Sequence, residues 1–165
     1  MAKINQKKYE NVILYLAKKL GGEIRGKKKL AKLLYFADFD FFEKCERPIT
    51  GDTYLAWPMG PVPESMEKVI SKMGDSKKLA ISVKENSPGY RPTEIYQALS
   101  EADSSVFDPE ELQILDRVAS KYGRMSGVEL EVLSHAEAPY IGTELNKEIA
   151  YELSLYRGTD FSGND

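Results

Sequence analysis

The chain has 165 residues, of which 42% are hydrophobic and 30% charged, and its net charge is −3. These proportions indicate one globular domain and exclude non-specific attraction of the whole chain to nucleic acid. The single cysteine, Cys45, excludes an internal disulfide, and the sequence lacks an apolar run long enough to span a membrane and the apolar core of a signal peptide, so we expect a cytoplasmic protein without a membrane partner.

Helical periodicity dominates the first 45 residues. Apolar side chains recur every three or four positions from Tyr9 to Leu20 behind an N-capping Asn5, which predicts a first helix that ends at Gly21. A second helix is predicted over about residues 27–44, with two apolar stripes. A helix of this kind is either central to the core or half core and half interface. The stripes are Leu30, Leu33, Leu34, Ala37 and Phe41, and Tyr35, Phe39 and Phe42.

Residues 47–63 are predicted to form an extended, proline-rich connector. Proline fixes φ and lacks an amide donor, so the connector should not pair as a central strand and should be stiff. Pro63 suits the first turn of a third helix, which should end at Gly74. The inward residues of that helix are Met66, Val69, Ile70 and Met73.

The second half alternates between short elements. Residues 77–85 and 90–99 have the alternation of two strands, joined by the turn residues of 86–89. Two capping boxes, Asp108 with Glu111 and Ser126 with Glu129, predict a fourth and a fifth helix. Residues 144–156 favour a final helix. The predicted fold is therefore mainly α (α+β), a single compact helical domain of five to six helices with a small β-hairpin, over residues 1–157, followed by a flexible tail over residues 158–165.

The candidate catalytic side chains form no recognisable constellation. His135 is the only histidine, and a helix-terminal residue that binds free carbonyls is favoured over a general base. Cys45 has acidic neighbours that should raise its pKa and make it a poor nucleophile. An enzyme centred on His135 and Asp38 is the least favoured hypothesis, and we expect no enzyme, cofactor or metal. Four acidic residues could hold a divalent cation, although a solvated face is favoured: Asp38, Asp40, Glu43 and Asp52.

Basic residues crowd the start of the second predicted helix. Each cation there interacts unfavourably with the helix dipole, at a cost of ~0.3–1 kcal/mol. An acidic protein or a phosphate backbone bound at this end would offset that cost. A solubilising collar is the favoured alternative. A winged helix-turn-helix is disfavoured because aromatic side chains occupy the face that should read bases. The collar consists of Lys18, Lys19, Arg25, Lys27, Lys28, Lys29 and Lys32.

The stretch YLAWPMGPVP (54–63) predicts a protein-docking surface. Tyr54, Trp57 and Met59 are residue types that dominate binding hot spots when they are held rigid. An equally weighted alternative is that Trp57 plugs the core beneath the connector. The candidate partner-binding residues are Tyr35, Asp38, Phe39, Phe42, Tyr54, Trp57, Met59 and Pro61, with Lys28, Lys29 and Lys32 steering an acidic partner.

Three ordered blocks resemble the Panacea (SocA-like) antitoxin domain family. They are KLAKLLYFADF (29–39), RPITGDTYLAWPMGPVP (47–63) and ELQILDRVASKYGRMSGVELEVLSHAEAPY (111–140). The resemblance runs through roughly residues 8–153, and it departs from the family pattern at Tyr140, where tryptophan is expected. The matching residues are Lys29, Leu30, Lys32, Leu33, Leu34, Tyr35 and Asp38, then Gly51, Tyr54, Gly60, Pro61 and Val62, then Leu133, His135 and Pro139.

The resemblance implies a mostly helical fold with a small β element, and a role as the antitoxin of a two-gene operon, often carried by a prophage. Such domains neutralise a toxin by direct contact, or deliver it to a protease as an adaptor. We therefore expect a non-enzymatic protein-binding module whose partner is a protein toxin. The alternative is a nucleic-acid-binding regulator that uses the basic N-terminal patch.

Overall fold

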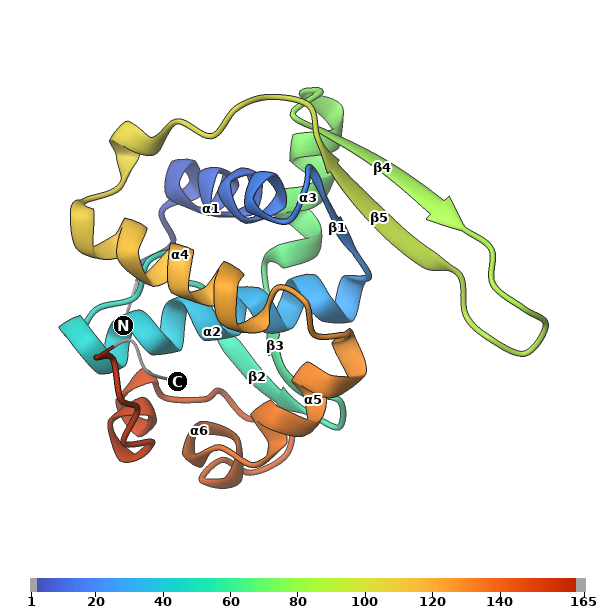
Figure 1. Cartoon of the computed structure of the whole chain (residues 1–165). Coiled ribbons are helices and arrows are strands. Elements are labelled where there is room, and N and C mark those ends of the chain that lie inside the picture. Colours follow the sequence, from blue (N-terminus) through green and yellow to red (C-terminus); the bar gives the residue numbers. More distant parts are fainter. Residues whose placement is uncertain (1–2, 163–165) are drawn as a thin grey trace.

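Helix α2 (Lys27–Cys45) runs through the centre of the computed structural model, which describes residues 3–162 (Figure 1). Every residue of α2 from Leu30 to Phe41 is buried. The helix packs against two later helices, α4 (Pro109–Tyr122) and α5 (Gly127–His135), and against the segment near the C-terminus. Both apolar stripes of the sequence therefore face protein, and α2 is central to the core.

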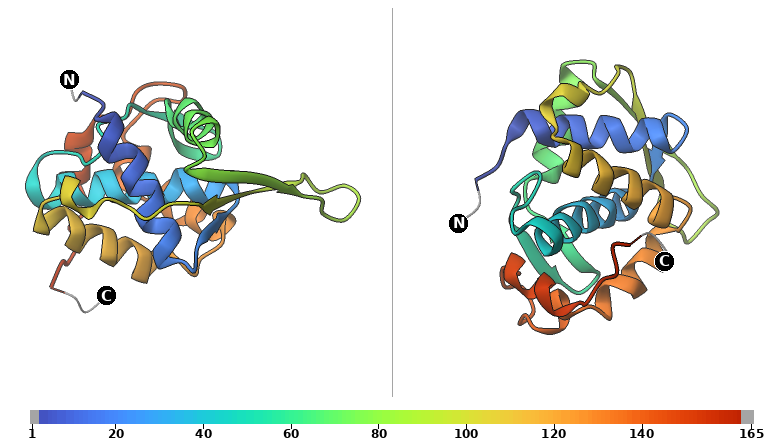
Figure 2. Two further views of the ribbon diagram at one scale, coloured as in Figure 1. Left: turned by 90° about the horizontal axis from the view of Figure 1, so that it is seen from above. Right: turned by 60° about the vertical axis from the view of Figure 1, so that its left-hand side comes forward.

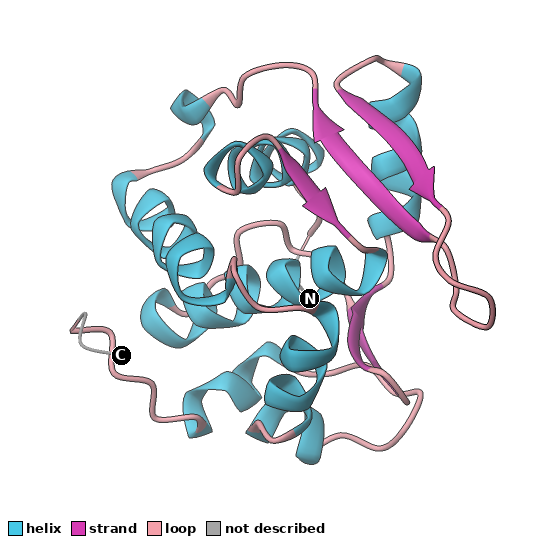
Figure 3. Ribbon diagram, turned by 45° about the vertical axis from the view of Figure 1, so that its right-hand side comes forward, coloured by secondary structure: helices cyan, strands magenta, loops and turns pink. Residues whose placement is uncertain are grey.

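The remaining elements surround α2 (Figures 1 and 3). The fold is α+β and mainly helical, and no helix within residues 3–162 is long and apolar enough to cross a membrane. The helices are α1 (Gln6–Lys19), α3 (Met66–Asp75), α6 (Ala138–Ile141) and the 3₁₀ helices η1 (Ser104–Val106) and η2 (Tyr151–Tyr156). One antiparallel sheet has the strand order β1-β5-β4, with β1 (Glu23–Arg25), β4 (Leu79–Lys84) and β5 (Thr93–Ala98). A separate hairpin pairs β2 (Tyr54–Trp57) with β3 (Gly60–Pro63).

Local signals in the sequence set the helix starts. The Asn5 side chain accepts a hydrogen bond from the amide of Lys8, as expected of an N-cap. Both predicted capping boxes form, one at the start of α4 and one at the start of α5. The predicted strand pair and the third helix are also confirmed, as β4, β5 and α3.

Three predictions about irregular segments were wrong. The connector is not extended throughout, because it folds back on itself as the β2–β3 hairpin. Pro63 is the last residue of β3 and does not start a helix. Residues 144–150 are not helical: the Ala56 amide donates to the Lys147 carbonyl (2.9 Å), and the Asn146 amide donates to the Ala56 carbonyl (2.7 Å). These bonds place residues 146–149 along the edge of β2 that does not pair with β3. Strand β1 was not predicted, since three residues carry too little alternation to be recognised.

Strands β4 and β5 extend beyond the body of the molecule as a long arm (Figures 1 and 2). Only the first residue of β4, Leu79, is buried, whereas the last four are exposed. The arm therefore contributes to the core at its base alone.

The segment after η2 is bound to α2 through Arg157. The Arg157 side chain is 3% exposed. Its guanidinium donates to Glu43 (2.8 and 3.0 Å), to Glu137 (3.0 Å) and to Asp40. The amide of Thr159 also donates to Glu43 (2.7 Å). The flexibility of residues 158–165 remains a prediction, and residues 163–165 lie outside the described part of the chain.

We expect Gly51→Ala to lower the free energy of unfolding by about 2–4 kcal/mol. Gly51 has φ +78°, which costs other residues roughly 1–2 kcal/mol, and a Cβ there would overlap the carbonyl of Lys3, an overpacking cost of about 1–3 kcal/mol. Urea denaturation followed by circular dichroism measures the change. Gly89 in the arm is the matched control, because it has φ +90° and open space around it. Equal losses for the two variants would contradict the overlap.

Candidate protein-docking surface

The buried carboxylate of Asp38 fastens the start of the connector to α2. Its Oδ1 accepts hydrogen bonds from the amides of Ile49 (2.8 Å) and Thr50 (2.7 Å). Its Oδ2 accepts from the hydroxyls of Thr50 (2.5 Å) and Tyr54 (2.6 Å). Burial raises the pKa of Asp38 above its ordinary value, and these four bonds oppose that rise. One side chain thus satisfies donors from three residues of the connector.

A second acidic residue, Asp52, fixes the middle of the connector. Its carboxylate accepts from the Tyr9 hydroxyl (2.6 Å) and from the amide of Ser65 (3.1 Å), and its carbonyl accepts from the Tyr151 hydroxyl (2.5 Å). The connector is therefore joined to α1, to the start of α3 and to the C-terminal segment. All of these bonds are inside or at the edge of the core.

Tyr54 fills the core beneath the hairpin. Its side chain is 1% exposed, and its ring makes edge contacts with the rings of Tyr35, Phe39 and Tyr151. Trp57, in contrast, is 45% exposed. The prediction that Trp57 plugs the core was wrong, because Tyr54 already occupies that position.

Lys32 holds β3 from below. It is 1% exposed, and its ammonium donates to the carbonyl of Pro61 (2.9 Å). Burial lowers the pKa of Lys32 to about 8. Since the ammonium is fully covered, Lys32 cannot present its charge to a partner.

The tip of the hairpin is held by two residues from the last helices. His135 lies with Nε2 3.0 Å from the carbonyl of Pro58 and Nδ1 2.8 Å from the carbonyl of Glu131. The hydroxyl of Tyr140 donates to the carbonyl of Trp57 (2.7 Å). The interpretation of His135 as a carbonyl-binding, helix-terminal residue is confirmed. The hairpin is thus fixed at its tip as well as at its base.

The other surface of the hairpin, here called the outer hairpin face, consists of Leu55, Trp57, Met59 and Val62. Leu55 pairs with Val62, and alternate residues of a strand share one face, so Leu55, Trp57 and Val62 point away from the core. Leu55 and Val62 are partly exposed, and Met59 at the turn is 47% exposed. This face presents apolar side chains on a backbone that cannot easily rearrange.

The structure divides the predicted partner-binding residues into two groups. Trp57 and Met59 are exposed and Phe42 is partly buried. Six others are buried and support the hairpin or the core from within. These buried residues are Tyr35, Asp38, Phe39, Tyr54, Pro61 and Lys32. Sequence reasoning missed Leu55 and Val62, although their alternation with Tyr54 and Pro61 was a usable signal.

The lysines of the collar form contacts within the molecule, and their steering of an acidic partner stays a prediction. Lys28 pairs with Glu131 (2.6 Å), and Lys29 donates to the carbonyl of Gly123 (2.6 Å). Burial lowers the pKa of Lys29. The remaining pairs are Lys18 with Glu101, Lys19 with Asp116, Arg25 with Glu23, and Lys27 with Glu67.

The predicted solvated acidic face was also wrong. Asp38, Asp40 and Asp52 are buried, and each interacts with different residues. Asp40, for example, forms ion pairs with Arg117 and Arg157. Within residues 3–162, no group of three or more histidine, cysteine or acidic residues could hold a metal ion. Asp38 and His135 have no partner in common, because Asp38 binds the connector amides and hydroxyls and His135 the carbonyls of Glu131 and Pro58.

The pKa of the Cys45 thiol is raised, as expected, but its causes differ from those predicted. Burial and a hydrogen bond from its thiol to Glu110 (3.0 Å) raise the pKa of Cys45 to about 11. The carboxylate involved belongs to α4 and not to the sequence neighbours of Cys45.

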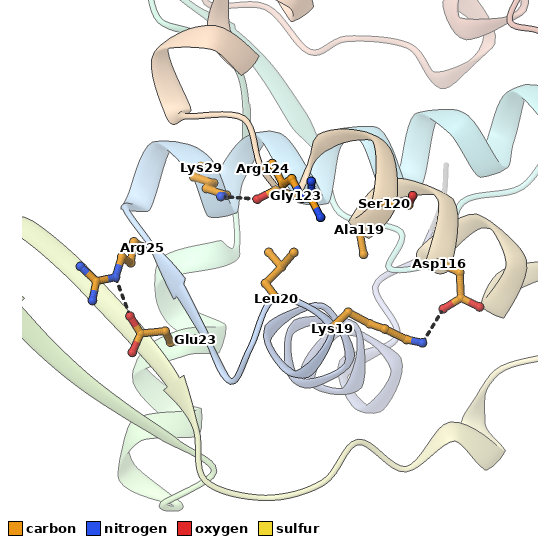
Figure 4. Close-up of a pocket in the computed structure, with 10 residues that line it drawn as sticks. All are labelled: Lys19, Leu20, Glu23, Arg25, Lys29, Asp116, Ala119, Ser120, Gly123 and Arg124. Carbon is orange, nitrogen blue, oxygen red and sulfur yellow. Dashed lines mark hydrogen bonds and ion pairs between the residues drawn. The ribbon is translucent and has the colours of Figure 1, made fainter. Parts of the chain in front are cut away.

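A cavity of about 870 Å³ lies away from the hairpin, between the ends of α1 and α4 and the start of α2 (Figure 4). Four basic and two acidic side chains line it: Lys19 pairs with Asp116 (3.3 Å) and Arg25 with Glu23 (2.6 Å), while Lys29 donates to the carbonyl of Gly123 and Arg124 adds a further positive charge. The cavity contains none of the residues of the outer hairpin face.

We expect Asp38→Ala to lower the free energy of unfolding by about 3–5 kcal/mol, because it leaves two buried amides and the Thr50 hydroxyl without their acceptor, and leaves the Tyr54 hydroxyl with the Leu34 carbonyl (2.9 Å) alone. Asp38→Asn keeps one acceptor oxygen for the two amides and should cost about half as much. Urea titration of both variants provides the measurement. A loss below about 1 kcal/mol for Asp38→Ala would show that the connector does not depend on this carboxylate.

The stability of the wild type relative to Lys32→Met should rise with pH. The pKa of Lys32 is about 8 in the folded protein and ordinarily near 10.4, so the unfolded chain binds more protons between these values and folding becomes more favourable as the pH increases. The expected gain between pH 7.5 and 9.5 is about 2 kcal/mol. Unfolding free energies of both proteins at the two pH values test this. A difference that does not change with pH would contradict it.

A scan against family models matches the antitoxin SocA-like, Panacea domain over residues 30–140, which is more than half of the chain. The matched segment contains α2 from Leu30 onward, the β2–β3 hairpin and α5, and therefore the Asp38, Lys32 and His135 contacts that hold the hairpin. No curated protein and no solved structure matches the chain. On the family match, the chain belongs to the antitoxin SocA-like, Panacea domain family.

Proposed function

We propose that the chain is a non-enzymatic binding module that neutralises a toxin by direct contact through the outer hairpin face. Membership of an antitoxin-like family supports the general role. Direct inhibition and delivery to a protease would both begin with this contact.

The observation that carries the proposal is the rigidity of an exposed apolar hairpin. Three of its backbone carbonyls are bound by side chains from elsewhere: that of Trp57 by Tyr140, that of Pro58 by His135 and that of Pro61 by Lys32. A surface that is already ordered loses little conformational entropy on binding. Tryptophan held in this way is the residue type most often found in binding hot spots.

Exposed apolar side chains continue on α5. Val132 is 67% exposed and lies one turn before His135, so the two are neighbours on the helix surface. Val128 lies one further turn back and is 63% exposed. Since His135 binds the hairpin tip, these valines enlarge the apolar surface on that side of the molecule.

The nucleic-acid-binding alternative has less support. Binding to a phosphate backbone requires lysine and arginine side chains that can release counterions. In the collar, Lys28 is paired with a carboxylate, Lys29 binds a carbonyl and Lys32 is buried. The same residues give no reason to expect an acidic partner.

We expect Trp57→Ala to weaken toxin binding by about 30-fold or more, because a rigid tryptophan at the centre of an interface contributes at least ~2 kcal/mol. Co-expression of each variant with the product of the neighbouring gene, followed by growth rescue and co-purification, provides the measurement. Tyr90→Ala is the matched control, since Tyr90 is an exposed aromatic residue (74%) in the arm. Loss of rescue with Tyr90→Ala but not with Trp57→Ala would move the contact to the arm. If the wild type neither rescues growth nor co-purifies, the proposed function is wrong.

A further inference from the structure

We infer that the outer hairpin face takes a cationic protein surface, one that places an apolar side chain on Trp57 and lysine or arginine side chains on Glu64 and Glu148. The inference rests on the proposed function in taking a protein as the occupant. It adds the chemistry of that protein, and it reverses the sign of charge that the lysine collar suggested.

The two carboxylates lie on the same face as the apolar residues. Leu55 is the strand partner of Glu148 on one side and of Val62 on the other. Side chains directly opposite each other in a sheet share a face and lie about 5 Å apart at Cβ. Glu64 follows Val62 by two positions along the chain, which returns it to the same face, and its amide donates to the carbonyl of Thr53 (2.8 Å), so the pairing with the strand continues to that point.

Both carboxylates are exposed and uncommitted. Neither Glu64 nor Glu148 forms an ion pair or a side-chain hydrogen bond with any residue in the range 3–162. The nearest cation to Glu148 along the chain is Lys147. Its main chain pairs with that of Ala56, so its side chain leaves the strand on the face opposite to Leu55 and Glu148. Glu144, in the turn before this segment, is exposed and adds to the negative charge.

Charge complementarity selects the occupant. Charged rims around an apolar centre control which partner is accepted, because like charges placed together cost several kcal/mol. A nucleic acid would bring phosphates against Glu64 and Glu148. A second copy of this chain would bring the same carboxylates against themselves. A basic protein surface satisfies both the carboxylates and the apolar residues between them.

The first experiment uses defined peptides and does not require the toxin. Trp57 is the only tryptophan, so its fluorescence reports occupation of this face. The probes are a tryptophan-free peptide in which leucines alternate with lysines, its counterpart with glutamates, and a lysine peptide with serines for leucines. We expect the lysine–leucine peptide to shift the emission of Trp57 and to bind at least about 10-fold more tightly than either control, with weaker binding at high salt.

Charge reversal at the face provides the matched comparison. Glu64→Lys/Glu148→Lys should weaken binding of the lysine–leucine peptide about 10-fold or more. Asp75→Lys/Glu85→Lys changes the net charge equally at exposed positions in α3 and the arm, and should leave binding unchanged. Equal binding of the glutamate peptide, or equal losses for the two double variants, would overturn the inference.

The same two variants, tested on the product of the neighbouring gene, separate this inference from the proposed function. A toxin that binds the wild type but not Glu64→Lys/Glu148→Lys supports both. A toxin that binds all three proteins equally leaves the proposed function standing and refutes the cationic occupant. If no toxin binds but the peptides discriminate as described, the antitoxin role is refuted and the preference for a cationic surface remains.

Discussion

The hydrogen bonds to the Asp38 carboxylate are the constraint on which the rest of the structure depends. A buried carboxylate without a cation beside it is costly unless donors surround it. Ile49, Thr50 and Tyr54 supply those donors, and they can do so only when the connector lies against α2. Folding the connector and satisfying the buried charge are therefore the same event. The position of the hairpin follows from this, since Tyr54 is both the last donor to Asp38 and the first residue of β2.

The residues that match the family pattern act mainly inside the molecule. Asp38 and Lys32 from α2, and His135 from α5, each bind backbone or hydroxyl groups of residues 49–61. These three side chains come from two separated sequence blocks and converge on a third. Most matched residues thus describe a support. Of the outer hairpin face only Val62 is among them, and Leu55, Trp57 and Met59 lie between matched positions.

The sequence predicted the regular elements better than the surface. Periodicity and capping residues are local properties, so the helix boundaries around Asn5, Asp108 and Ser126 could be predicted from neighbouring residues alone. The path of residues 144–150 could not, because hydrogen bonds to β2, about 90 positions earlier, override a helical pattern. The same limit applies to charge. Lys28 appears available in the sequence because its partner Glu131 comes from a distant helix, and Asp38 appears solvated because its donors belong to the next segment.

The ion pairs of Arg157 tie the order of synthesis to the completion of the fold. Arg157 follows Asp40 by 117 positions, and it is the partner of both Asp40 and Glu43 on the central helix. A nascent chain therefore carries two carboxylates on α2 that lack this counterion until residue 157 has left the ribosome. A product of translation that stops before residue 157 lacks this counterion, and Asp40 can then pair only with Arg117 if the product includes it. Such fragments should be more open to proteolysis than chains that include Arg157.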